Sequence, residues 1–107
     1  MSEIKIGEKF SAKSSVEYAD ASVVSKTIVK KDIGTISLFA FDKGQALSKH
    51  SAPFDALIQV VDGRAEIIID ETSHDLTAGE SIIMPANIPH AVKATEKFKM
   101  VLIMIKG

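Results

Sequence analysis

Short segments in which apolar and polar residues alternate make up most of this chain. The segments are rich in Val, Ile and Thr, which favour extended backbone. Alternation with a period of two is typical of a strand with one buried face, and no window has convincing helical spacing. The predicted strands are residues 23–30, 35–41, 47–50, 56–61, 64–69, 75–77, 81–84, 91–94 and 98–105. These roughly nine short antiparallel strands, with regularly spaced turns, predict an all-β sandwich or barrel.

Turn residues separate the predicted strands. Residues 31–34 read as the turn of a hairpin, and Asp62-Gly63 is a strong tight-turn pattern between two further strands. Residues 70–74, which end at His74, form another polar turn. Before residue 23 the pattern is weaker, and residues 4–10 are interpreted as either a short edge strand or an arm.

Composition narrows the function classes. At 107 residues, with 46% hydrophobic residues, 25% charged residues and a net charge of −1, the chain fits one globular domain over residues 1–107. Because there is no basic stripe, nucleic acid is not an expected partner. The absence of cysteine excludes disulfides, thiolate nucleophiles and zinc–thiolate sites. The longest apolar run, residues 100–105, is too short to span a bilayer, so we expect a cytoplasmic protein without membrane contact.

Two of the three histidines lie where apolar strands begin. His50 follows Gly44 in a short segment, and His90 follows a turn bounded by Pro85 and Pro89. Prolines fix the backbone φ, so they hold the side chain that follows in a defined place, as a binding site requires. His74 lies in a predicted polar turn, and we expect no role for it.

The spacing around these two histidines resembles the two cupin motifs. The first motif, Gly-X5-His-X-His-X3-Glu-X6-Gly, corresponds to residues 44–63, with Gly44, His50 and Gly63 in register. The second, Gly-X5-Pro-X-Gly-X2-His-X3-Asn, corresponds to residues 79–94, with its glycine, its proline and His90 in register. Asn87 takes the place of the motif's internal glycine, a mild change because Asn tolerates positive φ. The resemblance implies a jelly-roll double-stranded β-barrel of the small single-domain cupin type, often dimeric.

The resemblance also implies a metal site, and here the chain departs from the pattern. Typical cupins bind a divalent metal through two histidines and an acidic residue of the first motif and the histidine of the second. In this chain Ala52 replaces the second histidine, Ala56 the acidic residue and Ala94 the closing asparagine. Only His50 and His90 remain as candidate metal ligands.

Asp55 is the one nearby carboxylate that could serve as a third ligand. In a strand, residues of one parity share a face, which groups His50, Ala52 and Ala56 but leaves Asp55 on the other face unless the chain bends there. Catalytic zinc normally has three protein ligands and non-haem iron has two histidines and a carboxylate. The alternatives are therefore a metal-free pocket and a weakly held divalent transition metal; no cofactor is certain.

The predicted barrel pocket is apolar around the two histidines, and methionines in its lining would adapt to varied ligands. Two convergent imidazoles could orient a carboxylate, a phenol or a sugar hydroxyl. For most of the lining the alternative interpretation is plain core packing. The candidate lining residues are Phe41, Ala52, Phe54, Ala56, Met84 and Met100.

We therefore expect a small cupin barrel that binds a small organic ligand, with or without a weakly held divalent metal. The alternative is a metal-dependent enzyme, a dioxygenase or isomerase, that uses His50, His90 and an unrecognised third ligand. In a third interpretation the pocket is vestigial. A homodimer is also expected, with the N-terminal strands or arm of residues 1–30 in the interface, because a small barrel must cover its sheet edges.

Overall fold

The computed structural model describes residues 4–106 and contains eight antiparallel strands and no helix within them. Residues 1–3, which belong to the segment 1–30 expected in a dimer interface, and residue 107, the last of the predicted domain, lie outside the described residues. The strands are β1 (Val23–Lys31), β2 (Gly34–Phe41), β3 (Ala46–His50), β4 (Phe54–Ile69), β5 (Thr72–Thr77), β6 (Ser81–Met84), β7 (His90–Lys93) and β8 (Phe98–Lys106). The all-β prediction is confirmed, with eight strands in place of about nine.

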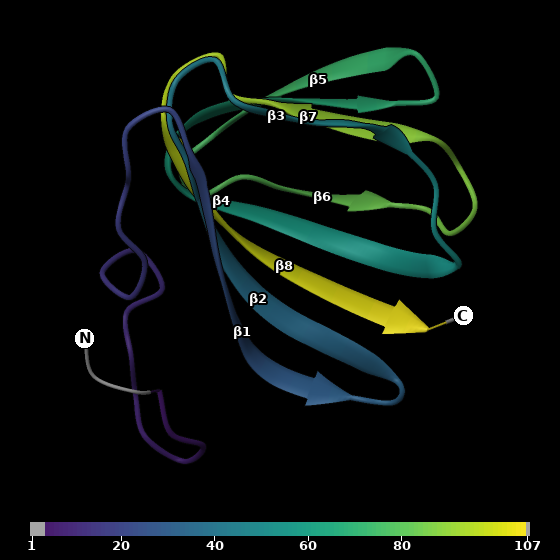
Figure 1. Ribbon diagram of the computed structural model, residues 1–107. Coiled ribbons are helices and arrows are strands. Elements are labelled where there is room, and N and C mark those ends of the chain that lie inside the picture. The colour runs from purple at the N-terminus through teal and green to yellow at the C-terminus, as the bar shows by residue number, and fades with distance from the viewer. Residues whose placement is uncertain (1–3, 107) are drawn as a thin grey trace.

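The strands form two sheets that face each other across the core and share β4 (Figure 1). In the first sheet the order is β1-β2-β8-β4-β6, and in the second it is β5-β4-β7-β3. The first half of β4 pairs with β8 and β6, and the second half pairs with β7 and β5. This one long strand therefore joins the two walls of the barrel.

The predicted tight turn at Asp62-Gly63 is wrong, because β4 continues through it. A register shift between Val60 and Asp62 marks a β-bulge, and Gly63 has a φ of 75°. A Cβ at Gly63 would lie 1.9 Å from the carbonyl oxygen of Lys97, so only glycine fits there. Bulges bend a strand without reversing it. The strands predicted on either side are therefore one bent strand, which accounts for the lower strand number.

The turn predicted over residues 70–74 is shorter in the structure. Asp70 and Glu71, with φ values of 45° and 72°, make the reversal between β4 and β5. β5 already begins at Thr72, so His74 is a half-buried strand residue opposite Ile67 rather than a turn residue. A two-residue connection with positive φ at both positions suits the twist of a hairpin.

The main core fills the space between the two sheets. Its fully buried side chains come from β2, β4, β7 and β8, and on β4 and β8 they occupy alternate positions, as the period-two pattern predicts. The rings of Phe41 and Phe98 stack with their centroids 4.5 Å apart. The largest fully buried members of this core are Phe41, Phe98, Ile58, Ile67, Met100, Val60 and Val92.

A second apolar cluster lies outside the barrel, beneath the N-terminal arm. Residues 4–22 form an arm without strands, which runs along the outside of the first sheet (Figure 1). Val16 of the arm packs on Leu38 and Ala40, the outward residues of β2. The hydroxyl of Tyr18 donates a 2.6 Å hydrogen bond to Asp62, which fastens the arm to the bent part of β4.

Candidate functional site

His50 and His90 lie side by side at one end of the second sheet. His50 ends β3 and His90 begins β7, and their Cα atoms are direct partners in the strand pairing. The ring centroids are 4.4 Å apart, with the planes inclined at 68°. Asn87 has a φ of 65°, in agreement with its predicted tolerance of positive φ, and its N–H donates to the Ala52 carbonyl at 2.8 Å. The turn before His90 is thus tied to the segment that follows His50.

Backbone carbonyls fix the tautomer of both imidazoles. Nδ1 of His50 lies 2.8 Å from the carbonyl oxygen of Ser48, and Nδ1 of His90 lies 3.2 Å from that of Ile88. A carbonyl oxygen only accepts hydrogen bonds, so in each neutral ring the proton is assigned to Nδ1. The lone pair of each ring is then on Nε2, where it can accept a hydrogen bond or bind a metal.

The two histidines differ in burial. His90 is 7% exposed, whereas His50 is exposed to solvent at the rim. Burial lowers the pKa of His90 below its ordinary value; the hydrogen bond to the Ile88 carbonyl opposes this, and the nearby His50 adds to it. At neutral pH His90 is therefore uncharged and acts as a hydrogen-bond acceptor at Nε2.

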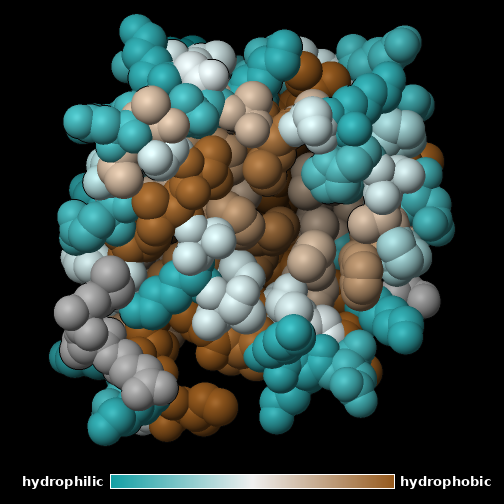
Figure 2. All heavy atoms as spheres, in the orientation of Figure 1, coloured by the Kyte–Doolittle hydropathy of each residue, from teal (hydrophilic) through white to brown (hydrophobic). Residues whose placement is uncertain are grey.

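An apolar cavity of about 50 Å³ adjoins both imidazoles. The structure places five predicted lining residues around it: Ala52, Phe54, Ala56, Met84 and Met100. In Figure 2 hydrophobic side chains gather between the two sheets, and hydrophilic side chains surround them. Of the described residues that line the cavity, only His50 and His90 have polar side chains.

Phe41 was predicted to line the cavity but lies elsewhere. It pairs with Phe98 at the first residue of β8, whereas the cavity is lined by residues further along that strand. Its fully buried ring stacks on Phe98 in the core. Parity placed Phe41 on the correct face of its strand, but parity does not specify the position along the barrel axis.

Several lining residues were not among the predicted ones. Leu47, Ile58, Val92 and Leu102 complete the wall. Ile58, Val92 and Leu102 each lie two residues from a candidate site residue on the same strand, so the period-two rule could have found them. Leu47 is separated from His50 by the register shift in β3, so the rule misses it.

Asp55 does not join the histidines. Its Oδ1 accepts a 2.9 Å hydrogen bond from the N–H of Ala86, so it holds the turn before His90 in place. Among residues 4–106 no three His, Cys, Asp or Glu side chains are grouped closely enough to hold a metal. With Ala52 and Ala56 in the cavity wall, the two imidazoles alone do not make the three-ligand set of a catalytic metal centre.

Comparison with known proteins identifies the family. Residues 37–106 match the model of the cupin domain, family Cupin_2. The chain therefore belongs to the cupin family. No curated protein sequence matches it.

Solved structures agree with this assignment. A conserved protein of unknown function from Streptococcus pyogenes, SPY1581, is 35% identical, with 99% of this chain and 93% of that chain covered and a TM-score of 0.92. A cupin superfamily protein from Desulfitobacterium hafniense is 26% identical, with coverages of 99% and 97% and a TM-score of 0.91. A Cupin 2 conserved barrel domain protein from Leptotrichia buccalis is 46% identical, with a TM-score of 0.83. The match to it covers 85% of this chain but only 44% of that longer chain.

The described residues include no helix with the length and apolar character needed to cross a membrane.

Proposed function

We propose that this cupin binds a small apolar molecule that carries a hydroxyl group, such as a phenol or an alcohol. The observation that carries the proposal is the pair of imidazoles, each with Nδ1 at a backbone carbonyl and a lone pair on Nε2, in an otherwise apolar cavity. A few placed polar groups in an apolar pocket are the usual arrangement of a small-molecule site.

The charge of the site favours a hydroxyl over a carboxylate. His90 is buried and its pKa is lowered, so it is neutral at pH 7 and accepts rather than donates at Nε2. A hydroxyl donates a hydrogen bond to such an acceptor, whereas a carboxylate can only accept. A carboxylate would also lose its hydration in an apolar cavity without a cation to offset the loss.

The cavity volume limits the ligand. About 50 Å³ is far below the roughly 300–1,000 Å³ of pockets that enclose a drug-sized ligand. The cavity thus admits the hydroxyl end and a small apolar body, and the remainder of the ligand lies at the exposed rim beside His50. Met84, Met100 and Met104 line the cavity and can adjust to the shape of that body.

Calorimetric titration with phenol, and with toluene as a probe of similar shape without the hydroxyl, tests the proposal. We expect phenol to bind and toluene to bind about fivefold more weakly, since a net hydrogen bond contributes about 1 kcal/mol. His50→Ala and His90→Ala should each weaken phenol binding, and His74→Ala is the matched control. Equal binding of both probes, or loss of binding in the His74 variant alone, would contradict the proposal.

A second candidate function is a loosely held divalent metal, which the same Nδ1 contacts favour. Metal-binding histidines usually donate the other ring N–H to a carbonyl or carboxylate, as His50 and His90 do. Copper or nickel best suits an imidazole pair, and the metal would supply open positions for water or ligand. Elemental analysis of the untagged protein should then give about one metal per chain, absent from the His50→Ala, His90→Ala double variant. A metal-free protein would remove this candidate and the metal-dependent dioxygenase or isomerase with it.

A further inference from the structure

The imidazole cavity lies at the end of the barrel where β3 and β8 end and β4 begins (Figure 1). Its floor on the first sheet is apolar, and at the mouth of the cavity this floor ends with Phe54 and Met104. In the strand pairing Phe54 is opposite Lys106, and Met104 is opposite Thr35. The Cα atoms of such partners are about 4.5–5.5 Å apart, so Lys106 and Thr35 are direct neighbours of the lining.

Strand parity places these neighbours on the cavity side of the first sheet. Lys106 is two residues beyond Met104 on β8, and side chains two residues apart in a strand share a face. Ile105, between them, is 59% exposed and belongs to the outer face. Lys30 is the partner of Thr35 on β1 and continues the same row. A polar rim of Lys106, Thr35 and Lys30 therefore borders the apolar lining.

The two lysines of the rim are available to a ligand. Both side chains are exposed, and neither forms an ion pair within residues 4–106. Asp55, next to Phe54, has the opposite parity, and its carboxylate already accepts the N–H of Ala86. Asp32 lies beyond Lys30, in the exposed turn between β1 and β2. The rim thus retains a net positive charge beside an apolar cavity.

Thr35 carries a second feature that points to a ligand. Its Oγ1 is buried and has no hydrogen-bond partner in the described part of the chain. Buried polar groups are nearly always hydrogen-bonded, and a group left without a partner destabilises the fold. Met104, the neighbour of Thr35 on the side of the cavity, is half-buried and has a flexible, unbranched side chain. A shift of that side chain would bring a ligand oxygen within reach of Oγ1.

We propose that the ligand carries a carboxylate at the end opposite its hydroxyl, and that the rim of Lys106, Thr35 and Lys30 binds this carboxylate. The inference rests on the proposed function, because the hydroxyl at the imidazoles determines which end of the ligand faces the rim. The two ammonium groups donate charge-assisted hydrogen bonds to a carboxylate, and the threonine hydroxyl can donate a further one. At the rim the carboxylate stays partly hydrated, so it avoids the desolvation that excludes it from the cavity.

The two ends of the site require opposite groups. Nε2 of the neutral His90 only accepts a hydrogen bond, and the ammonium group of Lys106 only donates. A ligand with a hydroxyl at one end and a carboxylate at the other satisfies both, whereas the reversed ligand would place its carboxylate against another acceptor. The ligand class is therefore a hydroxy acid with an apolar body, such as a phenolic acid.

Calorimetric titration with three probes tests the proposal. para-Hydroxyphenylpropanoate carries both groups, para-propylphenol carries only the hydroxyl, and phenylpropanoate carries only the carboxylate. We expect para-hydroxyphenylpropanoate to bind about fivefold more tightly than para-propylphenol at low ionic strength. Added salt should reduce this advantage, because it screens exposed charges. A hydroxy acid that binds no more tightly than para-propylphenol would overturn the proposal.

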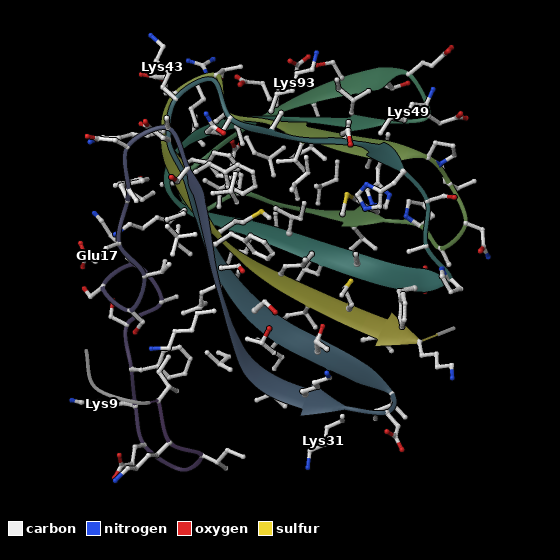
Figure 3. The ribbon with its side chains drawn as sticks, in the orientation of Figure 1. Lys9, Glu17, Lys31, Lys43, Lys49 and Lys93 are labelled. Atoms are coloured by element: carbon white, nitrogen blue, oxygen red, sulfur yellow. The ribbon has the colours of Figure 1, made fainter. Side chains whose placement is uncertain are left out.

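Two consecutive lysines of β1 provide matched variants. The Lys30→Gln, Lys106→Gln double variant should bind para-hydroxyphenylpropanoate and para-propylphenol equally. Lys31→Gln should keep the advantage of the hydroxy acid, because Lys31 points away from the barrel interior (Figure 3). Thermal unfolding verifies that each variant folds. An advantage that persists in the folded double variant, or that disappears in Lys31→Gln, would overturn the proposal.

The same titrations separate the rim from the imidazole site. If para-hydroxyphenylpropanoate and phenylpropanoate bind equally, the hydroxyl site is contradicted, while weaker binding of both by the lysine double variant would still support the rim. If the hydroxyl strengthens binding and the carboxylate adds nothing, the hydroxyl site stands and the rim is overturned. Binding of none of the three probes would overturn both.

Discussion

His50 and His90 are direct partners across β3 and β7, with ring centroids 4.4 Å apart. Each donates its Nδ1 proton to a carbonyl two residues earlier in its own strand or turn. The pairing of two strands from different parts of the sequence thus places two hydrogen-bond acceptors, the Nε2 atoms of the two imidazoles, next to each other. Because one ring is buried and the other is at the rim, the proposed ligand would place only one of its ends in the barrel.

The buried His90 makes the fold sensitive to mild acid. Burial lowers its folded-state pKa below the unfolded value of about 6.5. Between these two pKa values the unfolded chain binds more protons, so the free energy of unfolding rises with pH in this window. We expect the melting temperature to fall as the pH is lowered from 7.5 to about 5, since protonation then favours the unfolded state.

The control for this pH dependence is the same scan on two variants. His90→Gln should flatten the curve over this window, and His74→Gln should not. The carboxylates with lowered pKa values, such as Asp62 and Asp75, add their own loss of stability only at more acidic pH, because they titrate below the imidazole range. A wild-type curve that is level from pH 7.5 to 5 would contradict the buried neutral imidazole.

Tyr18 should resist ionisation well above its ordinary range. Burial raises the pKa of Tyr18, and the hydrogen bond to Asp62 and its negative charge raise it further. Tyr18 is the one tyrosine in the chain and there is no tryptophan, so phenolate absorbance reports this group alone. We expect no phenolate signal up to about pH 11, beyond the ordinary pKa near 10. Asp62→Asn should shift the titration towards pH 10, and a wild-type midpoint already at 10 would count against the contact.

Gly63 should be far less replaceable than Gly79. Both have positive φ, but a Cβ at Gly63 would overlap the Lys97 carbonyl, whereas one at Gly79 meets nothing within 4 Å. Gly63→Ala should lower the free energy of unfolding by about 3 kcal/mol or more, because the bulge and the β4–β8 pairing must shift. Gly79→Ala should lower it by only about 1–2 kcal/mol, from backbone strain alone. Denaturant unfolding measures both, and equal losses would show that the close approach at Gly63 is unimportant.

Restoring ligands should convert the cavity into a tighter metal site. Ala52 and Ala56 line the cavity beside the histidines, at the positions where cupins typically carry a second histidine and an acidic residue. The Ala52→His, Ala56→Glu variant should bind nickel at least about a hundredfold more tightly than the wild type, because four protein ligands replace two. Calorimetric titration measures this, with Ala46→His at an exposed site as the control. An affinity no higher than that of the control would show that these positions do not converge.

The sequence predicted the class of fold because period-two alternation and turn residues report strand faces directly. The second motif correctly indicated that His90 begins a strand, and Asn87 does take positive φ. His50, in contrast, ends β3 rather than beginning a strand. Asp62-Gly63 was misjudged because the same residue pair suits a tight turn and a bulge, and only the pairing of β4 with both sheets distinguishes them. Phe41 was placed on the correct face but at the wrong end of the barrel. The hydrogen bond of Asp55 to Ala86 depends on tertiary contacts that no local pattern encodes.

Side-chain nitrogen NMR of the three histidines, with and without phenol, tests the central claim most directly. The account predicts that His50 and His90 both carry the proton on Nδ1 at pH 7.5, and that phenol shifts the Nε2 signals of these two residues. His74 should not respond. Protons on Nε2 of His50 and His90, or phenol-induced shifts no larger than that of His74, would contradict the claim that two imidazole acceptors form the ligand site.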